Sequence, residues 1–282
     1  MIPPDIRALI LDMDGVLWKD DCPIGDLPRI FQRIHDRGLK ISFATNNGTL
    51  TPVGYAERLT RFGIPAETCQ VVTSSLVAAE MVAEALPVPY NPPSSPQYAR
   101  GEGARSGGLA RAVFAIGGDG LLQALRLKGI EPLPVERAGE ALAVVMGFDR
   151  AITFEKMAVA SLLVRRGVPF FATNPDKTFP TPRGEIPGAG AWVSVIVTAT
   201  GVEPVFAGKP APHMFELARK RLGTPKCKTL VVGDRLETDI AGAQADEMPT
   251  ALVLSGVSTR EQAEAWKPKV DIIAKDLGEL VG

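Results

Sequence analysis

Runs of apolar residues alternate with amphipathic segments along the first quarter of the chain. The apolar run Ala8–Leu11 leads into two aspartates, and two further strands are expected over Lys40–Thr45 and Gln70–Thr73. Between these runs, Asp26–Leu39 and Thr51–Phe62 carry apolar residues three and four positions apart. Uninterrupted apolar strands that alternate with helices are typical of a parallel sheet covered on both faces. The opening pattern therefore predicts a βαβαβ unit.

The middle of the chain has the pattern of a second α/β unit. A helix expected over Ser75–Leu86 leads into residues 87–108, where prolines and glycines are so dense that we expect a long, mobile loop. Further elements follow, with strands expected over Ala112–Ile116, Ala141–Met146 and Pro169–Ala172, and helices over Gly120–Leu127 and Thr153–Arg166. We interpret residues 76–204 as an inserted α/β domain.

The last third returns to the opening pattern. A strand is expected over Val205–Gly208, directly before Lys209, and a helix over Pro212–Leu222. Further buried strands are expected over Thr229–Asp234, Thr250–Leu254 and Val270–Ala274. Residues 1–75 and 205–282 are thus predicted to form one core domain. The predicted fold class is α/β, with a doubly wound parallel-sheet, Rossmann-like core interrupted by the inserted domain.

Composition excludes several classes of protein. The 282 residues are 45% hydrophobic and 22% charged, as in an ordinary globular protein, and the net charge of −1 predicts no nucleic-acid or membrane partner. No apolar run is long enough to span a membrane, and the first residues lack the features of a signal peptide. Cys22, Cys69 and Cys227 share no metal-ligand spacing, which is typical of reduced thiols, so we expect a cytoplasmic protein. Two histidines argue against a His-rich metal site.

Polar residues follow several of the expected strands. They are Asp12 and Asp14, then Thr45, Asn46 and Asn47, then Lys209, and finally Asp234 and Asp239. The carboxyl ends of parallel strands meet at one edge of a sheet, where ligands bind. Each group alone has an ordinary explanation as a solvated turn, a loop cation or a carboxylate near a helix start, but their convergence favours a site. Carboxylates leaving a buried strand need a partner, and hard oxygen ligands favour Mg²⁺.

Four short motifs occur in a fixed order. They are Asp12-Met13-Asp14-Gly15, Ala44-Thr45-Asn46-Asn47, Gly208-Lys209-Pro210 and the Gly233–Ile240 segment GDRLETDI. This order resembles the haloacid dehalogenase (HAD) superfamily of hydrolases. The insert between the second and third motifs resembles a class IIA cap, as in the NagD-like, p-nitrophenylphosphatase and phosphoglycolate phosphatase branch. The resemblance covers nearly the whole chain and weakens over residues 87–108.

The resemblance implies a role for each motif in phosphate transfer. Asp12 is expected to attack phosphorus and form an aspartyl-phosphate, while Asp14 protonates the leaving oxygen and then activates water. Thr45, Asn46 and Asn47 are expected to bind phosphate oxygens, and Lys209 to stabilise the developing charge. The expected cofactor is Mg²⁺, held by Asp12 and Asp234 and by the backbone carbonyl of Asp14. Whether Asp239 is a direct ligand or holds the shell around the ion is left open.

Three residues of the insert are candidates for contact with the leaving group. The resemblance places Asn174, Asp176 and Arg183 near a substrate-facing loop of the cap, although Arg183 fits a solvated loop cation equally well. A cap without a dense basic patch favours a small phosphorylated metabolite as partner. The resemblance also implies a possible homodimer through the cap.

The sequence therefore predicts a Mg²⁺-dependent phosphatase of small phosphate monoesters, with p-nitrophenyl phosphate as a generic substrate. Because phosphatases protonate an oxygen and dehalogenases attack carbon, Asp14 favours phosphate esters. A phosphotransferase or mutase on the same core is the nearest alternative, followed by a receiver-like signalling module and a phosphate-binding protein with a vestigial site. Phosphoglycolate, pyridoxal phosphate, glycerol phosphate, nucleoside monophosphates and sugar phosphates all remain open as substrates.

Overall fold

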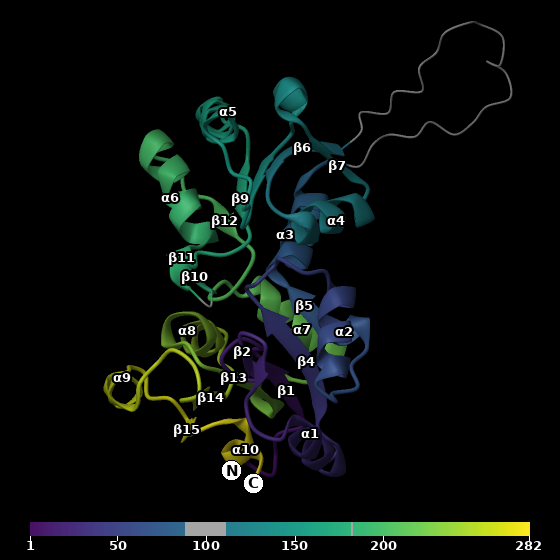
Figure 1. Ribbon diagram of the computed structural model, residues 1–282, viewed down its shortest axis with the longest axis vertical. Coiled ribbons are helices and arrows are strands. Elements are labelled where there is room, and N and C mark those ends of the chain that lie inside the picture. Colours follow the sequence, from purple (N-terminus) through teal and green to yellow (C-terminus); the bar gives the residue numbers. More distant parts are fainter. Residues whose placement is uncertain (88–110, 182) are drawn as a thin grey trace, which may run out of the picture.

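The computed structural model describes residues 1–87, 111–181 and 183–282. Two parallel sheets form a core domain and a cap, which occupy the lower and upper halves of Figure 1. Both chain ends lie at the base of the core, where the N–H of Ile2 donates to the carbonyl of Leu280 at 3.2 Å. The predicted α/β fold class is confirmed. The loop expected over residues 87–108 lies outside the described residues, apart from Pro87.

The core sheet has six parallel strands in the order β15-β14-β13-β1-β4-β5. Their bounds are β1 Ala8–Leu11, β4 Lys40–Thr45, β5 Val71–Thr73, β13 Thr229–Gly233, β14 Thr250–Val253 and β15 Ile272–Ala274. Strand β1 lies in the middle and pairs with both β13 and β4. The expected strands at the start of the chain and after Pro225 are therefore neighbours in space.

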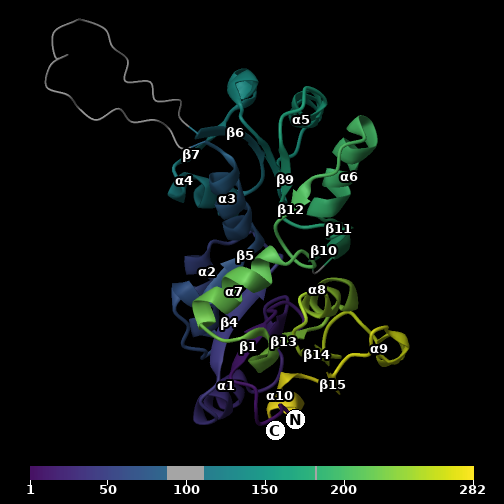
Figure 2. The ribbon, with the colours of Figure 1, turned by 180° about the vertical axis from the view of Figure 1, so that it is seen from behind.

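Side chains of β1 alternate between two hydrophobic clusters, one on each face of the sheet. Leu9 and Leu11 pack with helices near the chain ends, whereas Ala8 and Ile10 pack with α7 (His213–Leu222), which crosses the sheet in Figure 2. The core helices are α1 Leu27–Asp36, α2 Pro52–Arg61, α7 His213–Leu222, α8 Ala241–Ala245, α9 Arg260–Ala265 and α10 Leu277–Val281. Burial on both faces explains why β1 is apolar without interruption.

Two of the core helices begin as the sequence predicts. The Asp26 side chain accepts from the N–H of Arg29 and caps α1, and Thr51 caps α2 by accepting from Gly54 at 3.1 Å. A side-chain acceptor at this position satisfies one of the N–H groups left unpaired at a helix start. Short 3₁₀ or π turns at η1 Thr68–Gln70, η4 Lys226–Lys228 and η5 Leu236–Ile240 complete the core.

The cap sheet has five parallel strands in the order β12-β9-β8-β6-β7. Their bounds are β6 Arg111–Ile116, β7 Ile130–Leu133, β8 Val144–Met146, β9 Phe170–Ala172 and β12 Val205–Phe206. One face packs against α5 Phe154–Arg165 and α6 Ala189–Thr200, and the other against α3 Ser74–Ala85 and α4 Asp119–Leu127. The cap therefore has a hydrophobic cluster of its own.

The structure corrects the placement of residues 205–208. The sequence interpretation put this strand in the core sheet, but β12 pairs with β9 of the cap, with Val205 beside Phe171. An apolar run shows that a strand is buried and does not show which sheet it joins. The strand expected from Ala141 begins at Val144, and the 3₁₀ helix η3 Val135–Glu140 precedes it. The domain boundaries at 76 and 204 stay a prediction.

Two short antiparallel hairpins lie near the junction of core and cap. The first pairs β2 Trp18–Lys19 with β3 Cys22–Pro23, and the second pairs β10 Thr178–Thr181 with β11 Gly184–Pro187. Neither hairpin was expected from the sequence, nor were β7 and α6. Among the residues that the structure describes, no helix combines the length and the hydropathy that crossing a membrane requires.

Candidate active site

A cavity of about 880 Å³ lies between the core and the cap, at the carboxyl ends of the core strands. Strands β1, β4 and β13 are neighbours in the core sheet, so Asp12, Thr45 and Asp234 arrive side by side at the cavity floor. The cap contributes β10 and β11 to the wall. The convergence expected from the order of the motifs is therefore present in the structure.

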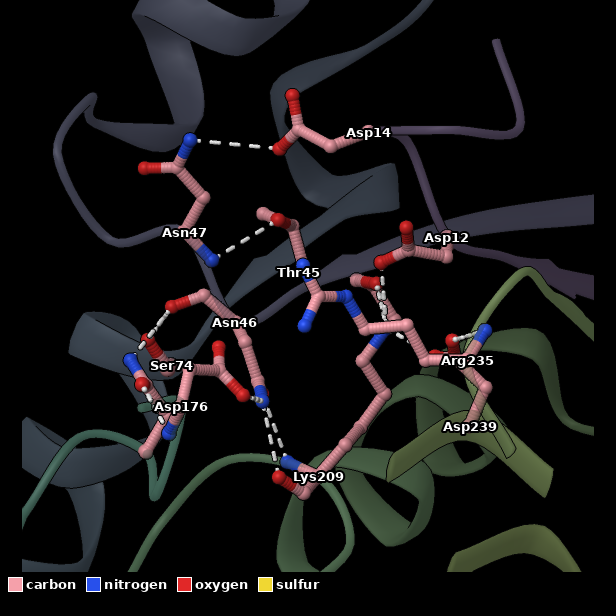
Figure 3. A network of polar contacts seen from close by, with 12 residues as sticks. Asp12, Asp14, Thr45, Asn46, Asn47, Ser74, Asp176, Lys209, Arg235 and Asp239 are labelled. Carbon is pink, nitrogen blue, oxygen red and sulfur yellow. Dashed lines mark hydrogen bonds and ion pairs between the residues drawn. The ribbon is translucent and has the colours of Figure 1, made fainter. Parts of the chain in front are cut away.

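The ammonium group of Lys209 lies between two buried carboxylates. Its Nζ is 2.5 Å from Asp12 Oδ1 and 2.6 Å from Asp239 Oδ1, and it also donates to the carbonyl of Ala44 at 2.9 Å (Figure 3). Burial acts to lower the pKa of Lys209, but Asp12 and Asp239 raise it well above its ordinary value. The lysine is a fixed positive charge beside Asp12.

Asp12 sits in a strongly electrostatic environment. Burial raises its pKa well above the ordinary value, Lys209 acts to lower it, and the carboxylates of Asp239 and Asp234 raise it further. A buried carboxylate has lost its hydration and needs a paired cation, which Lys209 provides for Asp12. Asp12 is therefore oriented by Lys209 and exposed to the cavity on its remaining side.

Asp12, Asp234 and Asp239 form a candidate metal site. One ligand oxygen from each lies within 4.8 Å of the others, and all three residues are buried. Backbone N–H groups hold the outer oxygens, since Val257 donates to Asp234 Oδ2 at 2.8 Å and Arg235 donates to Asp239 Oδ2 at 3.1 Å. Three carboxylates outnumber the nearby cations Lys209 and Arg235. This donor set fits a hard divalent cation.

The environment of Asp234 supports that reading. Burial, followed by repulsion from Asp239, raises the pKa of Asp234 to about 7. Two glycines let the chain approach its carboxyl group: a Cβ at Gly256 would lie 1.9 Å from Oδ2, and one at Gly15, whose φ is +84°, would lie 2.5 Å away. The glycine that follows Asp14 thus serves the packing of Asp234.

Asp14 is held apart from this cluster of carboxylates. Its Oδ1 accepts from the indole N–H of Trp18 at 3.0 Å, and its Oδ2 accepts from the side-chain amide of Asn47 at 3.3 Å. Figure 3 shows Asp14 facing Asn47 while Asp12 faces the lysine. The two aspartates of the first motif therefore have different environments, as distinct chemical roles require. The expected metal contact through the Asp14 carbonyl stays a prediction.

The turn after β4 is fixed by its own side chains. Thr45 Oγ1 accepts from the N–H of Asn47 at 3.0 Å, and Thr49 donates to Asn47 Oδ1 at 2.7 Å. The hydroxyl of Tyr55 donates to the carbonyl of Asn47 at 2.7 Å, and burial raises the pKa of Tyr55 well above its ordinary value. Thr45 and Asn47 are thus held at the cavity, where the expected contacts with phosphate stay a prediction.

Asn46 joins the core to the cap. Its Oδ1 accepts from the N–H of Lys209 at 2.8 Å, and its Nδ2 donates to the Lys209 carbonyl at 2.9 Å and to Asp176 Oδ1 at 3.2 Å. The Asn46 carbonyl accepts from Ser74 at 2.6 Å and from Asn174 at 2.8 Å. The side chain of Asn46 is therefore occupied by structural contacts, which sequence reasoning did not anticipate.

The three cap candidates occupy different positions. Asn174 is buried and its amide donates to Asn46 and to Thr173, so it ties the cap to the core. Asp176 lines the cavity, and burial raises its pKa although the hydrogen bond from Asn46 lowers it. Arg183 is exposed at the turn between β10 and β11, on the cavity wall.

Sequence reasoning missed several residues that border the cavity. Trp18 contacts Asp14, and the guanidinium group of Arg58 lies 4.4 Å from the Trp18 ring centroid. In the cap, Phe148 and Phe179 stack with centroids 4.5 Å apart. Arg235 follows Asp234 directly, and Figure 3 shows its side chain extending across the site. In the sequence, Trp18 does not differ from an ordinary core aromatic residue.

Comparison with known families and proteins agrees with this geometry. The sequence model of the haloacid dehalogenase-like hydrolases matches residues 9–131, and the model of the HAD-hydrolase-like family matches residues 206–280. The protein belongs to the haloacid dehalogenase-like hydrolase family. The two matched segments contain the motifs at Asp12, Thr45, Lys209 and Asp234. The resemblance to HAD enzymes with a class IIA cap is thereby confirmed.

Named relatives of this HAD hydrolase are phosphatases and a nucleotidase. A 5′-nucleotidase of Bacillus subtilis is 36% identical over 256 residues, which cover 90% of either chain. An acid sugar phosphatase of Staphylococcus saprophyticus is 33% identical, with 98% of this chain and 96% of that protein covered. The chain is an enzyme, a HAD hydrolase of the phosphatase branch.

Solved structures extend the likeness to the cap. A p-nitrophenyl phosphatase from Archaeoglobus fulgidus superimposes with a TM-score of 0.84 at 32% identity, covering 99% of both chains. A glycerol phosphate phosphatase from Mycobacterium tuberculosis, in complex with magnesium, superimposes with a TM-score of 0.83 at 31% identity, covering 98% of this chain and 76% of that one. Core and cap therefore share their arrangement with known HAD phosphatases.

Proposed function

We propose that this HAD hydrolase is a Mg²⁺-dependent phosphatase that cleaves small phosphate monoesters through an aspartyl-phosphate. The observation that carries the proposal is the position of Lys209 between Asp12 and Asp239 at the floor of the cavity. A phosphate dianion repels a carboxylate nucleophile, so a fixed cation beside both lowers the barrier.

Asp12 is the nucleophile in this proposal. One carboxylate oxygen forms a bond to phosphorus while the bond to the ester oxygen breaks, and the electron pair leaves with that oxygen. Lys209 orients Asp12 and stabilises the charge on the transferring group. Thr45 and the backbone of the turn after β4 provide donors for the remaining phosphate oxygens.

The cluster Asp12, Asp234 and Asp239 is the proposed magnesium site. When bound, Mg²⁺ supplies positive charge that screens the phosphate from the surrounding carboxylates. The backbone N–H groups of Val257 and Arg235 hold one oxygen each of Asp234 and Asp239, which fixes the two carboxylates within the cluster. Asp239 serves either as a direct ligand or as the partner that places Lys209.

Asp14 completes the reaction as acid and then base. It gives its proton to the departing ester oxygen and afterwards accepts one from the water that attacks the aspartyl-phosphate. The hydrogen bonds that Asp14 accepts from Trp18 and Asn47 hold it outside the metal cluster. In this position Asp14 can reach the leaving group.

The cap is proposed to select a small leaving group. The cavity of about 880 Å³ is lined on the cap side by residues that include Phe179 and Arg183, and its size fits a small metabolite. Relatives named for nucleotides, acid sugar phosphates and glycerol phosphate support this class without choosing among its members. The possible homodimer through the cap stays a prediction.

Hydrolysis of p-nitrophenyl phosphate tests the proposal. We expect turnover with magnesium, loss of turnover with EDTA, and loss in Asp12→Asn, whose circular dichroism spectrum and thermal unfolding should match those of the parent protein. Inorganic phosphate should appear in stoichiometric yield with nitrophenol. Transfer of phosphate to added alcohols in place of release would favour the phosphotransferase alternative, and retained turnover in Asp12→Asn would remove Asp12 as nucleophile.

A further inference from the structure

The side chain of Trp18 is placed to control the orientation of Asp14. The indole N–H donates to Asp14 Oδ1 at 3.0 Å, and the amide of Asn47 donates to Oδ2 at 3.3 Å. The terminal torsion of an aspartate is broad when the carboxyl group is free. With a donor on each oxygen, the plane of the Asp14 carboxyl group is fixed.

Trp18 is itself immobilised by the hairpin that follows Asp14. It is fully buried, its ring lies 5.5 Å from that of Phe62, and the guanidinium group of Arg58 lies 4.4 Å from its centroid. The Trp18 carbonyl accepts from the N–H of Gly15 at 2.8 Å, which closes the turn between the two residues. Arg58 also binds the hairpin tip at Asp21. The indole nitrogen is therefore a rigid donor.

The chemistry of the two donors suits an acid that must lose and regain a proton. An indole N–H donates only, so Trp18 does not accept the proton that Asp14 carries. The Asn47 amide is turned toward Asp14 because its oxygen accepts from Thr49. The two donors lie on different oxygens of the Asp14 carboxyl group. They hold the orientation of the carboxyl group, and neither the indole N–H nor the amide NH₂ accepts a proton.

We propose that Trp18 is a positioning residue that aims the Asp14 carboxyl group at the ester oxygen of the leaving group. This inference rests on the phosphatase mechanism proposed above. In the step it serves, the phosphorus–oxygen bond breaks, the electron pair stays on the ester oxygen, and that oxygen takes the proton of Asp14. Trp18 is fully buried, and its indole N–H is bonded to Asp14, so it acts through Asp14.

Leaving-group dependence distinguishes this role from a purely structural one. Nitrophenolate departs without a proton at neutral pH, whereas an alkoxide needs one. We expect Trp18→Phe, which keeps the ring and loses the N–H, to lower kcat for glycerol phosphate roughly tenfold, the scale of a lost hydrogen bond to a charged group. The same variant should keep kcat for p-nitrophenyl phosphate within about threefold and leave KM for both substrates near the parent values.

Two further variants complete the experiment. Phe62→Leu loosens the packing around Trp18 and keeps the N–H, so we expect no selective loss on glycerol phosphate. Asp14→Asn should show a larger selective loss than Trp18→Phe. Equal losses on both substrates in Trp18→Phe, or a selective loss in Phe62→Leu, would overturn the positioning role and leave the phosphatase mechanism standing. An absence of leaving-group dependence in Asp14→Asn would instead overturn Asp14 as the acid, and with it the role of Trp18.

Discussion

Asn46 and Lys209 are joined by two hydrogen bonds, although they belong to different motifs. The amide oxygen of Asn46 accepts from the backbone N–H of Lys209 at 2.8 Å, and its amide nitrogen donates to the Lys209 carbonyl at 2.9 Å. Both residues are buried. The turn after β4 therefore determines where the backbone of the third motif lies, and with it the position of the ammonium group.

Asn46→Ala should impair both stability and turnover. Loss of the amide leaves buried groups of Lys209 unpaired, so we expect the free energy of unfolding to fall by about 1–3 kcal/mol in urea titrations. Displacement of the lysine should lower kcat about 10- to 100-fold. Ser74→Ala is the matched control, because it removes one bond to the Asn46 carbonyl and leaves both contacts with Lys209 intact. A kcat for Asn46→Ala equal to that of Ser74→Ala would contradict this reading.

The pKa of Asp234 predicts a pH-dependent response to magnesium. Because burial raises this pKa to about 7 from 3.8, the folded, metal-free protein holds the proton more tightly than the unfolded chain does. The resulting stability is fully present below the unfolded value and is lost as pH rises through about 7. Magnesium binds the ionised carboxylate, so the increase in Tm that it causes should grow from about pH 5.5 to about pH 8.

Thermal unfolding with EDTA and with excess magnesium measures this response across the same pH range. Asp234→Asn lacks the titrating group and should show a small magnesium effect at every pH. An increase in Tm that does not change with pH in the parent protein would argue that Asp234 is not part of the metal site.

Asp239→Asn tests whether the negative charge of Asp239 is needed at the metal cluster. The variant preserves the size of the side chain and removes the negative charge 2.6 Å from the Lys209 ammonium. We expect the magnesium concentration for half-maximal activity to rise about 10- to 100-fold, because this carboxylate orients or ligates the ion. Titration of activity with magnesium provides the measurement. Glu237→Gln, an exposed acid on the same turn, should leave the titration unchanged.

Gly120→Ala should disturb the contact between cap and core. A Cβ at this position, in the first turn of α4, would lie 2.1 Å from the backbone carbonyl of Gly48, in the turn after β4. Alanine normally favours a helix over glycine, so a loss of stability here would report the clash. We expect an unfolding free energy lower by about 1–3 kcal/mol, together with reduced kcat. Gly139→Ala, which meets nothing within 4 Å, is the control and should behave as the parent protein.

The pattern of apolar and polar residues predicts the core strands well, because a buried strand needs apolar residues along its length. Strands β1 and β4 have the bounds expected from their apolar runs, and the polar residues after them meet as the sheet topology requires. Contacts between side chains and residues far away in the sequence cannot be recognised from such a pattern. The side chain of Asn46 contacts the backbone of a residue 163 positions away, and Trp18 reads as an ordinary core aromatic until its N–H is seen against Asp14. The amide of Asn174 binds the carbonyl of Asn46, another long-range contact that the sequence does not indicate.

The pairing of β12 with β9 determines how this enzyme can be rebuilt. Residues 205 and 206 belong to the cap sheet, and Lys209 follows three positions later. If a cap were transplanted with its boundary at residue 204, the transplanted cap would lack its edge strand β12. Residues 205 and 206 would stay with the core, next to Lys209, without the β9 strand with which they pair. A boundary after Phe206 keeps the cap sheet complete. The last strand of any donor cap must then pair in the register that places Lys209 beside Asp12. Exchange of caps within this branch is therefore constrained at the junction between Phe206 and Lys209, because the last strand of the cap leads directly into that lysine.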